Sequence, residues 1–142
     1  MEKYLKLLNQ NRVLNLATSY KDNPRSSILE YIMVNGNILI MTDSKTIKAG
    51  NLAKNPKISL SVMASDPGAN LEELHYLAAD GTVTDADPND IKVFNKVLIE
   101  RYPEFEAFMS SGAMNNKYFR IIIDTVYYSE GMKPAEIIKV KK

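Results

Sequence analysis

Residues 38–48 read ILIMTDSKTIK, an apolar run that leads directly into the start of a helix. The run that ends at Met41 fits a strand. Thr46 opens a predicted helix, which stops at Asn55-Pro56 because proline restricts the residue before it. The first turn of a helix carries unpaired N–H groups and a partial positive charge, so it binds anions readily. This segment therefore predicts an anion site at a strand-to-helix junction.

Two lysines strengthen that prediction. Lys45 and Lys48 fall at the start of the helix, where a cation opposes the helix dipole by about 0.3–1 kcal/mol. A broken local rule is typical of a functional site, and a bound phosphate would reverse the sign of the effect. The hydroxyls of Thr42, Ser44 and Thr46 can donate to an anion or cap the helix. The alternative is that the lysines are solvated and that Ser44 or Thr46 is only a helix cap.

The neighbouring strand offers further donors to the same anion. Asn35-Gly36 separates two apolar runs and predicts a type I′ hairpin turn. The strand Arg25–Val34 should therefore pair with the strand Asn37–Met41. It opens with Arg25-Ser26-Ser27, a guanidinium and two hydroxyls that suit a phosphate. Read alone, Arg25 fits an exposed strand end better than an anion site. Both faces of this strand are apolar, so we expect both to be covered.

The rest of the chain predicts a single mainly β (α+β) domain over residues 1–142, built as a six-stranded antiparallel barrel with helical crossovers. The turn before the second strand is expected at Lys21–Pro24, and the C-terminal Lys139–Lys142 as a solvated end. The other expected elements are strands at Arg12–Ser19, Ile58–Met63, His75–Thr84 and Tyr118–Tyr128, helices at Glu2–Asn11, Pro88–Tyr102 and Phe105–Ser111, and a loop at Ser65–Asn70.

Composition excludes several kinds of chemistry. The 142 residues include no cysteine and one histidine, His75. The chain therefore has no disulfide, no zinc–thiolate site, no thiol nucleophile and no multi-histidine metal site of its own. A net charge of +1 gives no general attraction to nucleic acid. No apolar run approaches the about 20 residues that span a bilayer, and no signal-peptide core is present, so we expect a cytoplasmic protein without a membrane partner.

At the strand-to-helix junction described above, the chain resembles the pyridoxamine 5′-phosphate oxidase-like family of flavin-binding split barrels. Residues 41–48 are similar to the strand-to-helix phosphate motif of that family, with a threonine, a hydroxyl four residues on and a lysine two after that. Residues 52–60 (LAKNPKISL) look like the Leu-x-x-Asn-Pro-basic-x-x-Leu stretch that follows it. Gly81 resembles the glycine that closes a later strand. The clear likeness covers residues 12–63, and a weaker one reaches the C-terminus.

The resemblance implies a homodimer that holds FMN at the subunit interface. Thr42, Thr46 and Lys48 would bind the FMN phosphate. Arg25, Ser26 and Ser27 would line the phosphate and the ring, beside Met41, and Tyr76 falls where the family has a polar ring contact. FAD, a deazaflavin or haem are the alternative cofactors, since some relatives bind these instead.

Three departures argue against a true pyridoxamine phosphate oxidase. Ile47 stands where those enzymes have a second basic residue, and Glu30 or Tyr31 stands where they have a lysine. Their tryptophan-bearing C-terminal segment cannot exist in a chain without tryptophan. The resemblance is therefore to short stand-alone relatives of the general stress or flavin-reductase kind.

The sequence leaves the catalytic residues unknown and three functions open. The first is an FMN-dependent oxidoreductase that exchanges electrons with a nicotinamide or another small molecule. The second is a flavin carrier or sensor without turnover, and the third is a cofactor-free interaction protein. Glu30 reads best as a salt-bridge partner of Arg25 or of another subunit, and His75 as a structural residue.

Overall fold

The computed structural model describes residues 2–64 and 70–140. Of the loop expected at Ser65–Asn70, residues 65–69 lie outside the described residues, as do residues 141–142 of the expected solvated end. The described strands are β1 (Val13–Tyr20), β2 (Asn23–Val34), β3 (Asn37–Asp43), β4 (Lys57–Met63), β5 (His75–Asp85), β6 (Asn116–Glu130) and β7 (Glu136–Lys139). The described helices are α1 (Lys3–Gln10), α2 (Ile47–Lys54), α3 (Pro88–Arg101), α4 (Phe105–Ser110) and the short 3₁₀ helix η1 (Leu71–Glu73).

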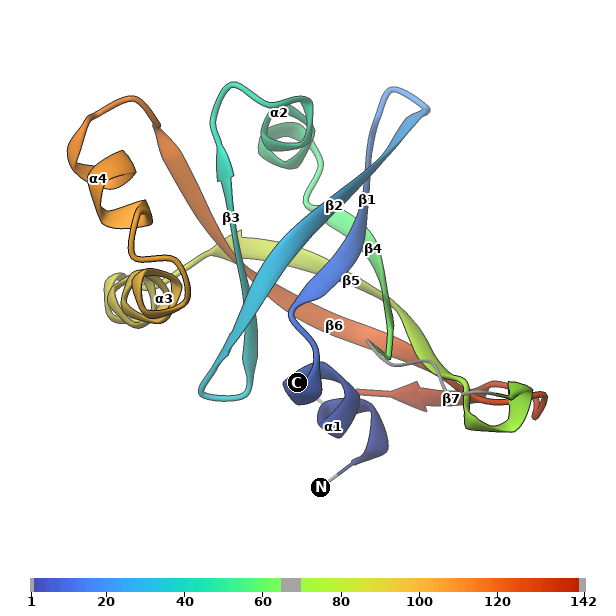
Figure 1. Cartoon of the computed structure of the whole chain (residues 1–142). Coiled ribbons are helices and arrows are strands. Elements are labelled where there is room, and N and C mark those ends of the chain that lie inside the picture. The colour runs from blue at the N-terminus through green and yellow to red at the C-terminus, as the bar shows by residue number, and fades with distance from the viewer. Residues whose placement is uncertain (1, 65–69, 141–142) are drawn as a thin grey trace.

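The strands form an antiparallel barrel, as the sequence predicts. They are hydrogen-bonded in the order β3-β2-β1-β4-β5-β6-β7, and a further pairing between β3 and β6 closes the ring of the first six. Helix α1 lies at one end of the barrel, α2 lies at the other, and α3 packs outside (Figure 1). Closure leaves only β7 as an additional strand on the outside of the ring.

Strand β6 changes partner halfway along its length, and the sequence analysis missed the second partner. Its first half pairs with β3 from Asn116 to Ile121, and its second half pairs with β7 from Thr125 to Tyr128. Lys139, expected at a solvated end, therefore lies in a strand and donates from Nζ to Thr125 Oγ1 at 3.1 Å. The expectation was wrong because β7 is only 4 residues long, too short for a clear alternation in the sequence.

Two tight turns fix the hairpins β1–β2 and β2–β3. Asn35 (φ 51°) and Gly36 (φ 79°) are both left-handed, which confirms the predicted hairpin turn. Lys21 (φ 51°) and Asp22 (φ 63°) make an equivalent turn. Pro24 thus pairs with Ser19 inside β2 instead of completing the turn, and β2 begins two residues earlier than expected.

Gly81 allows β5 and β6 to cross closely. The pairing shifts between Asp80 and Gly81, so that Gly81 opposes Ile123. A β-carbon on Gly81 would lie 2.1 Å from the backbone oxygen of Ile122. No side chain can fit there, so the bulge in this part of the barrel requires glycine.

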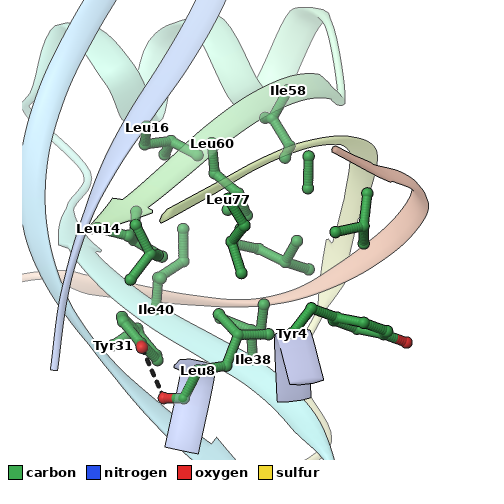
Figure 2. Close-up of a cluster of buried hydrophobic side chains, with 14 of the residues drawn as sticks. Tyr4, Leu8, Leu14, Leu16, Tyr31, Ile38, Ile40, Ile58, Leu60 and Leu77 are labelled. Carbon is green, nitrogen blue, oxygen red and sulfur yellow. Dashed lines mark hydrogen bonds between the residues drawn. The ribbon is translucent and has the colours of Figure 1, made fainter. Parts of the chain in front are cut away.

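The barrel interior is filled by large aliphatic side chains from every strand and by α1 (Figure 2). Tyr4, Leu7 and Leu8 of α1 are buried in this core. The Tyr31 hydroxyl donates to the backbone oxygen of Leu8 at 2.6 Å, and burial raises the pKa of Tyr31. Because the last carbonyls of a helix lack partners within it, this bond caps α1 as well as holding it on the barrel.

Strand β2 is covered on both faces only along its second half. Tyr31 faces the barrel interior, whereas Ile32 and Val34 pack outside against Phe94 of α3. Ile28 is 73% exposed, so the expectation of two covered faces was wrong for the first half of the strand. A long stretch of outer surface beside it therefore lies open.

Candidate functional site at the α2 end of the barrel

The junction between β3 and α2 is tied together by its own hydroxyls. Thr46 Oγ1 accepts from the Ala49 amide at 3.2 Å and donates to the Asp43 carbonyl at 2.9 Å. The hydroxyl oxygens of Thr42 and Thr46 lie 2.9 Å apart, within hydrogen-bond distance of each other. The interpretation of Thr46 as a helix cap is confirmed, and Ser44 is excluded as the cap residue. This bonding makes the helix start a preformed element.

Helix α2 presents free donors at its first turn. Ile47 and Lys48 are the first two residues of the helix. Their backbone N–H groups therefore have no carbonyl partner within α2. The first turn contains no acidic residue. Within residues 2–64 and 70–140, neither Lys45 nor Lys48 makes an ion pair. The helix start thus carries a partial positive charge, and among the described residues no carboxylate forms an ion pair with either lysine beside it.

Two asparagines dock α2 on β1; the sequence identified Asn55 only as the helix end and did not indicate Asn51. Asn51 Nδ2 donates to Thr18 Oγ1 at 3.1 Å, and Asn55 Nδ2 donates to the Ser19 carbonyl at 3.1 Å. Residues three and four apart share a helix face, so Lys48 lies on this same side of α2. The sequence signals were the Asn-Pro stop at Asn55 and the spacing of four residues between Asn51 in the helix and Asn55 at its C-cap.

The register of the first hairpin places Arg25 next to this side of α2. Arg25 pairs with Thr18, and Ser27 pairs with Leu16. Directly opposed residues of antiparallel strands point to the same face, and Leu16 and Thr18 point inward, toward the core and α2. Arg25 and Ser27 therefore share the inner face at the end of the barrel that α2 occupies.

The other predicted residues lie elsewhere. Ser26 points to the outer face, opposite Ala17. Met41 packs against the cluster under α3. Tyr76 pairs with Met63, at the end of β4 far from α2. The structure thus gathers Arg25, Ser27, Thr42, Thr46 and Lys48 at one barrel end and does not bring Ser26, Met41 or Tyr76 to them within one chain.

Exposed apolar side chains gather on the outer face of β2, β1, β4 and β5. Val13, Ile28, Met63 and Tyr76 are all at least 39% exposed there. The helices α1, α2 and α3 pack elsewhere. The residues between these side chains on the same face are small or uncharged, namely Asn15, Ala17, Ser26, Ser59, Ser61 and Ala78. We call this surface the open sheet face.

Of two titratable residues considered from the sequence, Glu30 has a different partner from those expected. Glu30 accepts from the Tyr102 hydroxyl at 2.7 Å and lies 3.5 Å from Arg101 Nη1, so it pairs with the end of α3 instead of Arg25. The hydrogen bond to Glu30 raises the pKa of Tyr102. His75 Nδ1 lies 3.3 Å from the Tyr128 hydroxyl, as expected for a structural histidine.

Two further classes of site are not found in the described residues. They contain no group of three or more histidine, cysteine, aspartate or glutamate side chains that could hold a metal ion. They also contain no helix that is both long and apolar enough to cross a bilayer.

A closed antiparallel barrel with a helix at each end defines a split-barrel protein. A family model described as Pyridoxamine 5′-phosphate oxidase matches residues 1–140. The chain belongs to this family. No curated protein matches the sequence.

Solved structures show the same fold at low identity. A heme binding protein from Mycobacterium smegmatis superposes with a TM-score of 0.79 at 13% identity, over 95% of this chain and 55% of that protein, so this chain spans about half its length. A FAD-binding protein from Mesorhizobium loti gives 0.68 at 21% identity, over 90% and 93% of the two chains. General Stress Protein 26 from Bacillus anthracis gives 0.66 at 17% identity, over 95% and 94%.

Proposed function

We propose that this protein binds FMN through the donors at the α2 end and acts as a flavin-dependent oxidoreductase on a small molecule. The observation that carries the proposal is the convergence of Lys48, Arg25 and the first amides of α2 on one side of a preformed helix start. Membership in the family supports a flavin, and the FAD-binding relative is consistent with it.

The donor set suits a phosphate monoester. Lys48 supplies a point charge, Arg25 a planar fork of N–H donors, and Ile47 and Lys48 supply backbone amides. Ser27 adds a hydroxyl on the same face. The neighbouring carboxylate of Asp43 is engaged locally, because its Oδ1 accepts a hydrogen bond from the Lys45 backbone amide at 2.9 Å. Thr42 and Thr46 then act mainly by holding the loop, with their hydroxyls already engaged.

When bound, a flavin supplies the electron-transfer chemistry, while the protein binds and orients it. The substrate is proposed to differ from pyridoxamine phosphate, because Ile47 replaces a basic residue and the chain has no tryptophan. A nicotinamide donor or a small acceptor remains the expected partner. We assign no described side chain at the α2 end as a general acid or base. A cytoplasmic location of the protein stays a prediction.

We propose further that two copies pair through the open sheet face. Exposed apolar side chains separated by small residues favour association, and in a homodimer the most common arrangement is a two-fold, self-complementary contact. An axis running across the strands would exchange the two ends of the face. It would carry the partner's Tyr76 toward the α2 end, where one chain alone lacks it. Ser26, which lies on this face, would then be buried in the contact.

A fluorescence titration with FMN tests the phosphate assignment. Lys48→Met should weaken FMN binding by about 1.5–3 kcal/mol, roughly 10- to 150-fold, because a charge-assisted contact is lost. Lys45→Met, three residues earlier in the same loop, is the matched control and should change little. Riboflavin, which lacks the phosphate, should bind the wild type weakly and be insensitive to Lys48→Met. Equal FMN affinity in the wild type and Lys48→Met would remove the assignment.

Steady-state oxidation of reduced nicotinamide by the FMN-loaded protein separates turnover from storage. Turnover well above the slow reoxidation of free FMN supports an oxidoreductase. A flavin-loaded protein without such turnover, across a panel of donors, would favour the carrier or sensor function. FAD, a deazaflavin or haem replaces FMN in the proposal if one of them is the group that copurifies.

A further inference from the structure

The other side of α2 borders a cavity that the flavin proposal does not use. It has a volume of about 510 Å³, within the range of small-molecule sites. It opens beside α2 at the ends of β5 and β6. Its lining residues are Ser44, Ala49, Gly50, Leu52, Ala53, Val83, Thr84, Asp85, Lys117 and Phe119. We call it the mouth cavity. Asn51, which donates to Thr18, lies on the opposite side of the helix, and Lys48 is not among the lining residues.

The cavity exists because the residues of α2 above it are small. Ala49, Gly50 and Ala53 leave Leu52 as the one large side chain that α2 contributes to the lining. A β-carbon on Gly50 would meet no atom within 4 Å. Glycine inside a helix is less favourable than alanine, because it loses more backbone entropy on folding. A residue that weakens its helix while leaving space open is typical of a binding site.

The walls of the cavity combine an apolar floor with two opposite charges. Leu52, Val83 and Phe119 are buried and form the floor. Asp85 pairs with Phe119 across β5 and β6, and Lys117 lies two residues before Phe119, so both charged residues share its face. In the described part of the chain neither Lys117 nor Asp85 makes an ion pair. The two charges flank the aromatic ring without neutralising each other.

From this arrangement we infer that the mouth cavity binds a small zwitterion with an aromatic body, of the α-amino acid class. The ring lies against Phe119, Val83 and Leu52. The carboxylate meets the Lys117 ammonium, the amino group meets the Asp85 carboxylate, and the Ser44 and Thr84 hydroxyls complete the rim. A ligand with only a carboxylate would leave Asp85 without a cationic partner, and a ligand with only an amino group would leave Lys117 without an anionic partner. The site is separate from the flavin proposal and does not rest on it.

Isothermal titration calorimetry on the whole protein tests the inference with three probes that share a phenyl ring: L-phenylalanine, which carries both charges, 3-phenylpropionate, which carries only the carboxylate, and 2-phenylethylamine, which carries only the ammonium. L-Phenylalanine should bind at least tenfold more tightly than either single-charge analogue. Lys117→Met should weaken L-phenylalanine at least tenfold, whereas Lys96→Met, an exposed lysine on α3, should leave it unchanged. Equal binding of all three probes, or no binding of L-phenylalanine at millimolar concentration, overturns the inference.

A cavity-filling variant gives a second test that does not depend on loss of folding. Gly50→Leu places a side chain in the open space and improves the helix, so the protein should be at least as stable as wild type while L-phenylalanine binding is lost. FMN affinity should stay unchanged, which separates this site from the phosphate site. Retained L-phenylalanine affinity in a stably folded Gly50→Leu protein overturns the inference.

Discussion

Helices of equal length lie at the two ends of the barrel, but they contact the barrel through different kinds of side chain. At one end, α1 inserts Tyr4, Leu7 and Leu8 and is capped by the Tyr31 hydroxyl. At the other end, α2 inserts Leu52 among small residues and is held by the amide groups of Asn51 and Asn55. The α1 end is filled mainly by apolar side chains and has a cavity of about 300 Å³ beside the helix, whereas the α2 end has polar contacts on one side and the larger mouth cavity of about 510 Å³ on the other.

The contrast separates stability from binding within one short chain. Large buried side chains contribute most of the apolar burial that stabilises a fold. Polar side chains, a polarised helix start and unfilled space contribute little to stability but can recognise ligands. We therefore expect substitutions at the α1 end to change the free energy of unfolding and substitutions at the α2 end to change affinity.

The largest effect should follow truncation of the α1 plug. Leu8 is 1% exposed, so Leu8→Ala should lower the free energy of unfolding by about 2–5 kcal/mol. Leu52→Ala should stay near the lower end of that range, because the cavity of about 510 Å³ that Leu52 borders is larger than the one of about 300 Å³ beside Leu8. Urea unfolding of both variants measures the difference. Equal losses at the two ends would contradict the contrast.

Removal of the cap on α1 should have the next largest effect. Tyr31→Phe keeps the packing of the ring but leaves the buried Leu8 carbonyl without its 2.6 Å donor. An unsatisfied buried group costs about 1–3 kcal/mol. Chemical denaturation gives the loss, and amide hydrogen exchange in α1 should rise more than in α2. Uniform exchange changes across both helices would argue against a local cap.

A smaller change of opposite sign is expected at the α2 end. Gly50→Ala should stabilise the protein by about 0.5–1 kcal/mol, because alanine loses less backbone entropy in a helix and meets open space. Thermal unfolding monitored by circular dichroism detects this shift. A destabilised variant would mean that the space above Gly50 is needed by the fold.

The sequence predicted local elements at both ends of the barrel better than the arrangement around them. The hairpin at Asn35-Gly36 and the cap at Thr46 follow from local backbone chemistry, so they could be identified from a few residues. The partner of Glu30 is Arg101, 71 positions later, which no local pattern encodes. Strand β7 was missed because pairing with β6, not a strong alternation of its own, makes it a strand.

The site divides in the same way. The loop from Thr42 to Lys48 was predicted because its hydroxyls and lysines are adjacent in the chain. The docking of Asn51 on Thr18 and the mouth cavity depend on how α2 lies across the barrel, which is a tertiary property. The positions of Ser26, Met41 and Tyr76 relative to a cofactor depend on a second subunit and stay predictions.

The smallest expected effect is the pH dependence of the α1 end. Lys3 Nζ lies 2.9 Å from Glu130, and this hydrogen bond holds the pKa of Glu130 below its ordinary 4.5 and the pKa of Lys3 above its ordinary 10.5. The carboxylate therefore contributes stability above pH 4.5 that is lost as pH falls through its lowered pKa. The ammonium contributes stability below pH 10.5 that is lost as pH rises through its raised pKa.

Lys3→Met should flatten both changes without altering the pH dependence of FMN binding at the α2 end. Urea midpoints across the pH range, at low and high salt, measure this, and the difference should shrink with salt because Lys3 is 67% exposed. A wild-type profile that matches Lys3→Met at every pH would show that the pair contributes nothing.

The central claim is that the α2 end holds a flavin by its phosphate. The most direct measurement is the visible absorption spectrum of freshly purified protein, with mass spectrometry of the compound that heating releases. The account predicts an oxidised flavin spectrum and released FMN in the wild type, with both strongly reduced in Lys48→Met and retained in Lys45→Met. A colourless wild-type protein that takes up no added FMN would contradict the claim and leave the barrel without its proposed cofactor.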